Sequence, residues 1–301
     1  MKILKLLGGF LAVLVSAVVL LVGFAYFKSN RSMNADWDVT PVAVQTASDS
    51  ATLAHGKHVA ETRGCMDCHD SDLSGRVVVD AMPVMMRMAG ANLTSGQGGV
   101  GSTYTDADWV RAIRDGVGPD GKSLRFMPSY EYRALGPEDL GALISYIKSV
   151  PPVDEESVEL AFGPMARVLY TLGQFPMVAA ELIDHSDTRF SQPEVGVTVE
   201  YGGYLASSCI GCHGPGFSGG KIPGGDPSWP AAANLTPHDS GLASWTFEAF
   251  NAFAQTGMTP DGRQVDAAVM PWPLLAAATE AEREAMWMYL ESLPPTEHGN
   301  R

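Results

Sequence analysis

The sequence predicts an all-α protein in which two tandem helical domains follow an N-terminal transmembrane helix. Three observations predict this class. A long uncharged apolar run opens the chain, one set of sequence landmarks occurs twice, and apolar residues near the end of each copy recur with the spacing of an amphipathic helix. No stretch sustains the alternation of apolar and polar residues that is typical of strands. Hydrophobic residues form 46% of the chain, which is enough for packed cores.

Residues 6–27 form an apolar run of 22 residues without a charge, flanked on each side by two basic residues. About 20 apolar residues suffice to span the hydrocarbon core of a bilayer. A cleavable signal peptide has a shorter apolar region followed by small residues, whereas this run ends in aromatic residues that suit a membrane interface. We therefore expect a membrane anchor at residues 1–28 and a polar stalk at residues 29–51, with a removed signal peptide as the alternative.

The landmarks of one copy recur between 141 and 144 positions further along the chain. The pairs are Cys65-Met-Asp-Cys68-His69 with Cys209-Ile-Gly-Cys212-His213, Asn92-Leu-Thr with Asn234-Leu-Thr, Pro119-Asp-Gly with Pro260-Asp-Gly, Met127-Pro with Met270-Pro, and Tyr146 before Pro151-Pro with Tyr289 before Pro294-Pro. A near-constant offset over five landmarks indicates a duplicated domain. We expect the first domain at residues 52–153 and the second at residues 201–301.

Each copy is expected to hold a short helix before its cysteine pair, a middle helix and a closing helix. The middle helices open at Thr105 and Thr246, which are typical N-cap residues, and stop at Gly116 and Gly257. Two prolines end each closing helix, because proline lacks an N–H donor and clashes with the preceding turn. The closing helices carry apolar residues on one face: Leu140, Leu143, Ile144 and Ile147, and Met286, Tyr289, Leu290 and Leu293.

Residues 154–200 join the two copies. The segment opens with acidic residues and continues as an apolar stretch that Gly163-Pro164, Arg167, Gly173 and Pro176 interrupt. These interruptions exclude a second membrane span. We expect a partly helical linker that packs on one or both domains.

The pattern Cys-x-x-Cys-His is the attachment signature of haem c. Two thiols add across the two vinyl groups of the porphyrin, and the adjacent histidine binds the iron. The alternatives are a thiol redox pair or a zinc site, but no thioredoxin-like pattern surrounds the cysteines and zinc takes four clustered ligands. We therefore expect two covalently bound haem c groups. Their residues are Cys65, Cys68, Cys209 and Cys212 as thioethers, and His69 and His213 as iron ligands.

The sixth iron ligand decides whether each haem is closed or open to small molecules. Met127 and Met270 precede proline in equivalent loops, so we expect both to bind iron. Methionine is also common core filler, and Met82, which precedes a proline as well, is the strongest rival in the first domain. A bis-histidine haem through His58 is a further alternative, although the equivalent residue of the second copy is Tyr204.

Asn92 and Asn234 open the repeated Asn-Leu-Thr segments. A polar side chain at this position is expected either to bind a haem propionate, to hydrogen-bond a loop carbonyl or to form a turn. All three roles stay open at this point.

The chain is acidic, with 34 Asp and Glu against 20 Lys and Arg and a formal net charge of −14. This charge repels nucleic acid and is compatible with a basic or neutral protein partner. Haem c is attached on the outer side of the bacterial inner membrane. We therefore expect a single-pass protein of that membrane whose haem domains face the periplasm.

The order of these motifs resembles the class I cytochrome c domain, over residues 52–153 and 201–295. More narrowly, it is similar to the cytochrome subunits of membrane-bound bacterial alcohol, aldehyde and gluconate dehydrogenases. Those subunits usually carry three haems, whereas this chain has two motifs. The resemblance implies two tandem class I cytochrome c domains and electron delivery towards the quinone pool or a terminal oxidase.

Together these features predict an electron-transfer protein and not an enzyme. Its expected partners are a donor, such as a dehydrogenase, and a respiratory acceptor, such as a terminal oxidase or a quinone-linked complex. A dihaem peroxidase with one open haem is the main alternative, and a haem-based sensor is another. The sequence shows no acid–base constellation for the former and no cytoplasmic output domain for the latter.

Overall fold

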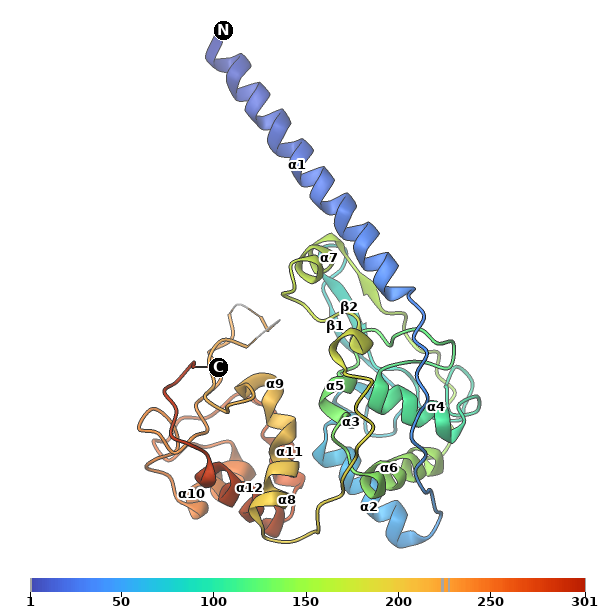
Figure 1. The fold of residues 1–301 in the computed structure, drawn as a ribbon, viewed down its shortest axis with the longest axis vertical. Helices are drawn as coiled ribbons and strands as arrows, with labels where there is room; N and C mark the ends of the chain where they lie inside the picture. The colour runs from blue at the N-terminus through green and yellow to red at the C-terminus, as the bar shows by residue number, and fades with distance from the viewer. Residues whose placement is uncertain (1, 223–224, 227, 301) are drawn as a thin grey trace.

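The computed structural model describes residues 2–222, 225–226 and 228–300. Figure 1 shows one long helix, α1, projecting from a body made of two helical domains that lie side by side. Five residues of the predicted anchor and second domain, Met1, Pro223, Gly224, Pro227 and Arg301, fall outside the described residues.

Helix α1 (Lys2–Met33) is long and apolar enough to cross a membrane, with a mean hydropathy of 2.7 in its most apolar window. It continues past residue 28, the predicted end of the anchor, because no proline or glycine follows before Met33. The segment expected to form a stalk then runs along the outside of the first domain. The N–H of Trp37 donates to the carbonyl of Gly121 at 2.9 Å, and the N–H of Ala47 donates to Ser145 Oγ at 3.0 Å.

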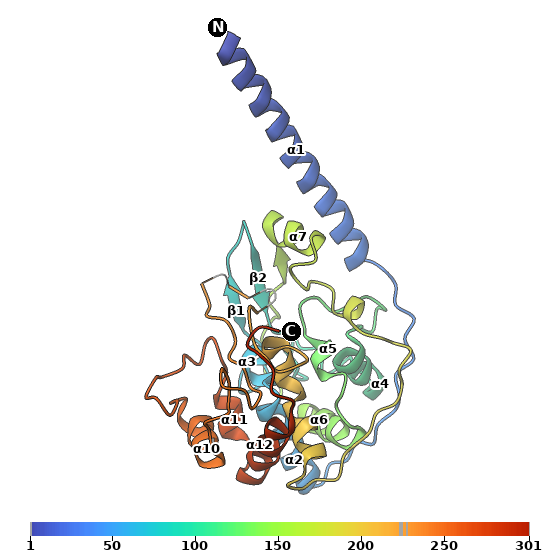
Figure 2. The same ribbon diagram turned by 60° about the vertical axis from the view of Figure 1, so that its left-hand side comes forward.

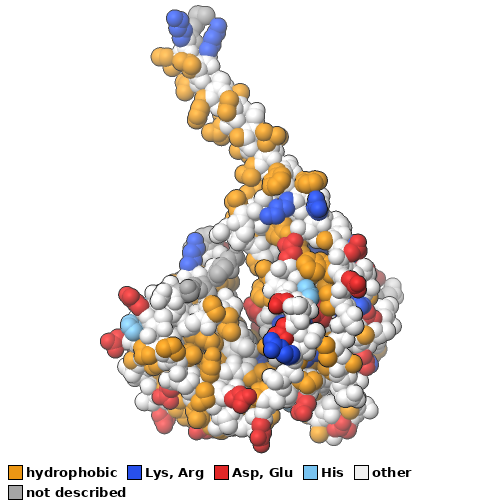
Figure 3. All heavy atoms as spheres, in the orientation of Figure 1, with side chains coloured by type: hydrophobic (Ala, Val, Ile, Leu, Met, Phe, Trp, Pro, Cys, Tyr) orange, Lys and Arg blue, Asp and Glu red, His pale blue; other side chains and the backbone are white. Residues whose placement is uncertain are grey.

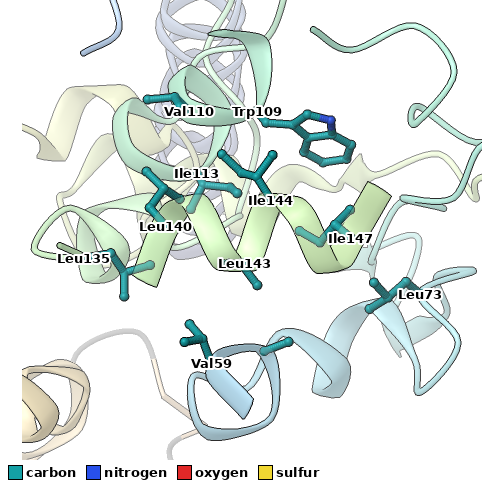
Figure 4. Packing of buried hydrophobic residues seen from close by; sticks show 11 residues of the cluster. Val59, Leu73, Trp109, Val110, Ile113, Leu135, Leu140, Leu143, Ile144 and Ile147 are labelled. Carbon is teal, nitrogen blue, oxygen red and sulfur yellow. The ribbon is translucent and has the colours of Figure 1, made fainter. Parts of the chain in front are cut away.

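The first domain is built from two helices that pack closely against each other, α2 (Ser50–Thr62) and α6 (Pro137–Ser149). Gly56 makes this approach feasible, because a Cβ there would lie 1.9 Å from the carbonyl oxygen of Ala142. The haem-motif helix α3 (Cys65–His69) follows α2 directly. Figure 4 shows the core between them, with Val59 of α2 facing the apolar side of α6.

The middle helix of this domain begins and ends as the sequence predicts. Thr105 caps α4 (Asp106–Val110) in a capping box with Asp108. The helix widens into a π-helical turn, η1 (Arg111–Asp115), and stops at Gly116, whose φ of +65° is left-handed. The short helix α5 (Ser129–Tyr132) follows the Met127-Pro loop.

The second domain repeats this arrangement. Its elements are α8 (Val199–Ala206), η3 (Ser207–Cys209), α9 (Ile210–His213), α10 (Phe247–Thr256), α11 (Pro273–Ala277) and α12 (Glu280–Ser292). Gly202 of α8 meets α12 as Gly56 meets α6, since its Cβ would lie 1.9 Å from the carbonyl oxygen of Ala285. Thr246 caps α10, and Gly257 ends it with a φ of +68°. The duplication predicted from the sequence therefore extends to the helix contacts.

The expectation of an all-α fold is wrong in one respect, because the first domain carries a small antiparallel sheet. Strands β1 (Val77–Asp80) and β2 (Met86–Ala89) form a hairpin after the haem motif, and β3 (Ala161–Phe162) of the linker pairs with β2. Strands of two to four residues are too short to show a period-two pattern in the sequence. Among the described residues, helices still hold many more residues than strands.

The linker also holds α7 (Pro164–Thr171) and the 3-10 turn η2 (Ala179–Leu182). Together with the hairpin and the end of α1 it forms a separate hydrophobic cluster. We call this the membrane-proximal cluster, and its buried members are Met33, Met86, Phe162, Ala166, Tyr170, Phe175, Met177 and Val178. The linker is therefore packed mainly on the first domain and on α1.

Replacing Gly56 by Ala should lower the free energy of unfolding by about 1–3 kcal/mol, because the new methyl group meets main-chain atoms of α6. Gly216→Ala is the matched control, since nothing lies within 4 Å of its Cβ position. Thermal unfolding followed by circular dichroism checks this. Equal melting temperatures for the two variants would contradict the close α2–α6 contact.

Two candidate haem sites

In the first candidate site the histidine of the motif is oriented by a main-chain carbonyl. His69 is the last residue of α3, and its Nδ1 lies 2.8 Å from the carbonyl oxygen of Ala91. An imidazole that donates its Nδ1 proton in this way presents Nε2 as the metal-binding nitrogen. Burial lowers the pKa of His69, which favours the neutral form that metals bind.

The second candidate site repeats this geometry. His213 ends α9, and its Nδ1 lies 2.8 Å from the carbonyl oxygen of Ala233. Ala91 and Ala233 each precede the asparagine of an Asn-Leu-Thr segment, so both copies use the same loop position to orient the histidine. The same histidine–carbonyl bond thus occurs in both domains. In each domain the motif histidine is oriented as a ligand of haem iron would need to be.

The four cysteines lie beside these histidines, and none forms a disulfide. Burial raises the pKa of the Cys65 thiol to about 12 and that of Cys209 to about 11, so neither is an activated thiolate. This argues against a thiol redox pair. Among the residues that the structure describes, no group of three or more His, Cys, Asp or Glu side chains could hold a metal ion, which argues against zinc.

The placement of the methionines favours Met127 over Met82. Met127 is partly buried and packs on the core of the first domain that Cys65 also contacts. Met82 lies between β1 and β2, is 38% exposed and does not belong to that core. Met270 occupies the loop of the second domain that corresponds to the Met127 loop and is partly buried. Iron binding by Met127 and Met270 stays a prediction.

His58 makes a contact with the second domain instead of pointing to a haem site as a free ligand would. Its Nε2 lies 2.8 and 2.9 Å from the two carboxylate oxygens of Glu282 in the second domain. This contact leaves the bis-histidine alternative without support.

Asn92 and Asn234 are fully buried and brace the loops that orient the histidines. The Asn92 amide donates to the carbonyls of Val153 and Glu155, both at 2.9 Å, while its oxygen accepts from Thr94. These bonds use both amide hydrogens, so the geometry supports the role of a loop contact over that of a propionate ligand.

The second copy has the same contacts around its asparagine. Asn234 donates to Ser240 Oγ at 3.0 Å and to the carbonyl of Thr296 at 2.7 Å, and it accepts from Thr236. In each domain the asparagine thus joins two segments. One is the loop whose carbonyl orients the histidine, and the other is the chain that follows the closing helix.

The two domains contact each other through a reciprocal pair of hydrogen bonds. His58 of α2 bonds Glu282 of α12, and Tyr204 of α8 donates to Asp139 of α6. His58 and Tyr204 occupy equivalent positions in the two copies, and so do Asp139 and Glu282. The interface therefore has approximate two-fold symmetry, because each of the two contacts is the copy of the other with the domains exchanged.

The same interface reaches the second haem motif and the helix that precedes it. Arg63, two residues before Cys65, donates to the carbonyl of Leu205 at 3.1 Å and lies 5.0 Å from the ring centroid of Tyr204. Glu131, which follows the Met127 loop, lies against Gly211 of the second motif. Burial raises the pKa of Glu131 to about 7.

Sequence reasoning missed these interface residues: Arg63, Glu131, Asp139, Tyr204 and Glu282 as contacts between domains. Each is an ordinary residue within its own segment. The only available signal was that Asp139 and Glu282 are both acidic at the same position of the repeat.

Comparison with known proteins agrees with this geometry. The model of the cytochrome c family matches residues 53–151 and 200–294. The cytochrome c subunits of quinone alcohol dehydrogenase from Gluconacetobacter polyoxogenes and from Komagataeibacter europaeus are each 26% identical over 284 residues, covering 85% of this chain and 59% of the relative. A nicotinate dehydrogenase subunit from Pseudomonas putida is 26% identical over 189 residues, covering 59% of this chain and 15% of that protein.

Replacing Asn92 by Ala should lower the free energy of unfolding by about 1–3 kcal/mol, since the buried amide's hydrogen bonds to the carbonyls of Val153 and Glu155 are lost. It should also shift the midpoint potential of one haem, because the carbonyl of Ala91 is no longer fixed. Redox titration and thermal unfolding check the two effects. Asn92→Asp, which keeps the acceptor for Thr94 but lacks the donors, should behave like Asn92→Ala. An unchanged potential in both variants would contradict the positioning role.

The His58–Glu282 bond should make the interface pH-dependent. Glu282 raises the pKa of His58 above its ordinary value of 6.5, so the bond's contribution is complete below that value and is lost as the pH rises through the raised pKa. The pKa of Glu282 is lowered to about 2, so its contribution is present above its ordinary 4.5 and disappears as the pH falls towards 2. The interface is expected to be strongest between these limits.

His58→Gln should therefore cost about 1 kcal/mol near pH 6 and much less near pH 9. Melting temperatures of the wild type and the variant at both pH values measure this difference. Tyr204→Phe is the matched control, because it removes the equivalent bond to Asp139 and should have the same effect at both pH values. A cost of His58→Gln that does not change with pH would contradict the assignment.

Proposed function

The chain belongs to the cytochrome c family, and from that premise we propose that it is a membrane-anchored carrier of single electrons with two covalently bound haem c groups. The chemistry of haem c is reversible one-electron transfer at the iron. The first haem would be held by Cys65, Cys68, His69 and Met127. The second would be held by Cys209, Cys212, His213 and Met270. We propose residues 52–153 and 201–301 as the two cytochrome c domains.

The observation that carries this proposal is the repetition of one histidine geometry in two domains that share an interface. Each histidine is oriented by the carbonyl before an Asn-Leu-Thr segment. Arg63 and Glu131 reach from the first domain to the second motif and the helix before it. Two sites held across one interface suit an electron that steps between them.

A dihaem peroxidase is less well supported. That chemistry needs an open iron with acid–base groups beside it. Of the histidines outside the motifs, His58 is bonded to Glu282 and His55 to Asp139, both at 2.8 Å. The electron-transfer role agrees with the relatives, which are named as cytochrome c subunits of dehydrogenases.

We propose a dehydrogenase as the electron donor and a quinone-linked complex or a terminal oxidase as the acceptor. The relatives are named as subunits of quinone alcohol dehydrogenase and of nicotinate dehydrogenase. This chain spans 59% of the length of the former, so the substrate of any such complex is not carried over. The net charge of −14 favours partners with neutral or basic docking surfaces and disfavours nucleic acid.

We propose that α1 is retained as a single-pass anchor in the bacterial inner membrane, with the haem domains in the periplasm. The last turns of α1 belong to the folded body, since Ala25, Ser29 and Met33 are buried there. Removal of the helix as a signal peptide would take away part of this contact. The packing therefore supports the anchor over a cleaved signal.

The visible spectrum of the reduced full chain, with haem quantified per chain, tests the proposal. We expect two c-type haems and no spectral shift on adding carbon monoxide, because methionine closes both irons. Met127→Ala and Met270→Ala should each let carbon monoxide bind about half of the haem and should lower the potential of that half. Met82→Ala is the control and should change neither. A shift in the wild type would favour the peroxidase alternative.

A further inference from the structure

Helix α7 of the linker is fixed to α1 at the point where the apolar run ends. Lys28 Nζ donates to the carbonyl of Thr171 at 3.2 Å. Arg167 donates to Ser29 Oγ at 2.6 Å and to Asn30 Oδ1 at 2.8 Å. The C-terminal end of α7 therefore lies at the level of Lys28, the first charged residue after the apolar run.

The β1–β2 hairpin is fixed at the same end of the body. Figures 1 and 2 both show the hairpin and α7 next to the base of α1, while α2 and α12 lie at the opposite end. Met33 at the end of α1 is buried in the membrane-proximal cluster together with Met86 of β2 and Phe162 of β3. Because this cluster is packed, α7 and the hairpin hold a fixed height relative to α1.

Large apolar side chains at this end face outwards. Leu172 is 58% exposed, Met165 is 53% exposed and Val84 is 52% exposed. Met165 and Val84 are neighbours, since the N–H of Met165 donates to the carbonyl of Val84 at 3.0 Å. We call these three residues the membrane-proximal cap. Figure 3 shows the apolar surface of α1 leading down to basic side chains at its base.

The charge of this end differs from that of the rest of the chain. The chain carries 34 acidic residues, yet residues 160–180 and residues 81–105 contain none. Each of these segments contains one basic residue, Arg167 and Arg87. Asp80 and Glu181 border these segments, and they pair with Arg87 and Tyr170 at 2.9 and 2.6 Å. The segments themselves carry no carboxylate, so anionic lipid headgroups repel this end less than an average surface of this acidic protein.

We propose that the membrane-proximal cap rests in the headgroup layer of the same bilayer that α1 spans, with phospholipid as its occupant. This inference rests on the anchor in the proposed function. Exposed apolar side chains close to basic residues, here Lys28 and Arg167, are a composition that binds this layer. Contact with lipid beside α1 would fix the tilt and the height of both haem domains above the membrane.

Spin labelling of the full haem-loaded chain tests the proposal. A nitroxide is attached at Leu172→Cys, in vesicles of phosphatidylcholine and phosphatidylglycerol, and at Met288→Cys of α12 as the matched control. Met288 is also exposed, at 36%, and belongs to α12, which lies at the end of the body opposite α1 in Figure 1. The measurement is the collision rate of each label with oxygen, which concentrates in lipid, and with a water-soluble nickel chelate. We expect an oxygen-to-nickel ratio several-fold higher at position 172 than at 288.

Equal ratios at the two positions would overturn the cap, and so would a label at 172 that collides with neither reagent, because protein would then cover it. Haem content checks that the variants fold, and Met165→Cys replaces Leu172→Cys if that variant loses its haem. Flotation of the chain with the vesicles separates the two hypotheses. Failure to float overturns the anchor and the cap together, whereas flotation with a water-exposed label overturns the cap alone.

Discussion

Close packing between the helix before each haem motif and the helix that closes the domain is the constraint on which the rest of the structure depends. Gly56 and Gly202 let these helices approach to main-chain contact. The chain leaving the closing helix then meets Asn92 or Asn234, which fastens the loop whose carbonyl orients the histidine. A glycine in the helix before the motif thus helps to decide where the histidine of the motif points.

The reciprocal bonds between the domains give the chain the interface of a symmetric dimer. In a symmetric interface both partners use the same surface patch, and a duplicated domain carries that patch once in each copy. The copies have since diverged, because one bond joins His58 to Glu282 and the other joins Tyr204 to Asp139. The two bonds respond differently to pH, because Glu282 raises the pKa of His58 above 6.5, whereas burial and Asp139 raise the pKa of Tyr204 well above its ordinary value of 10. The two contacts therefore occupy equivalent positions, but they differ in their ionisable groups.

Local signals in the sequence were sufficient for the helices but not for the contacts between them. Thr105, Thr246, Gly116 and Gly257 act within their own turns, so their roles are confirmed by the helix ends. The hairpin was missed because β2 finds its second partner in the linker. The roles of the two asparagines stayed open because three of their four acceptors, the carbonyls of Val153, Glu155 and Thr296, lie beyond the closing helices. Pairings between distant segments depend on packing, which one sequence does not display.

One difference between the copies has a physical reason in the contact with α1. Among the described residues, the hairpin occurs in the first copy, where it meets α7 and the end of α1 in one cluster. Arg167 and Lys28 tie the linker to the helix across that contact. An anchor joined by a free stalk would let the haem domains tumble at variable distance from a membrane partner. Helix α1 shares a hydrophobic cluster with the first domain, so the proposed anchor would keep each candidate haem site at a fixed distance from the membrane. A fixed distance suits electron transfer, because its rate falls steeply with distance.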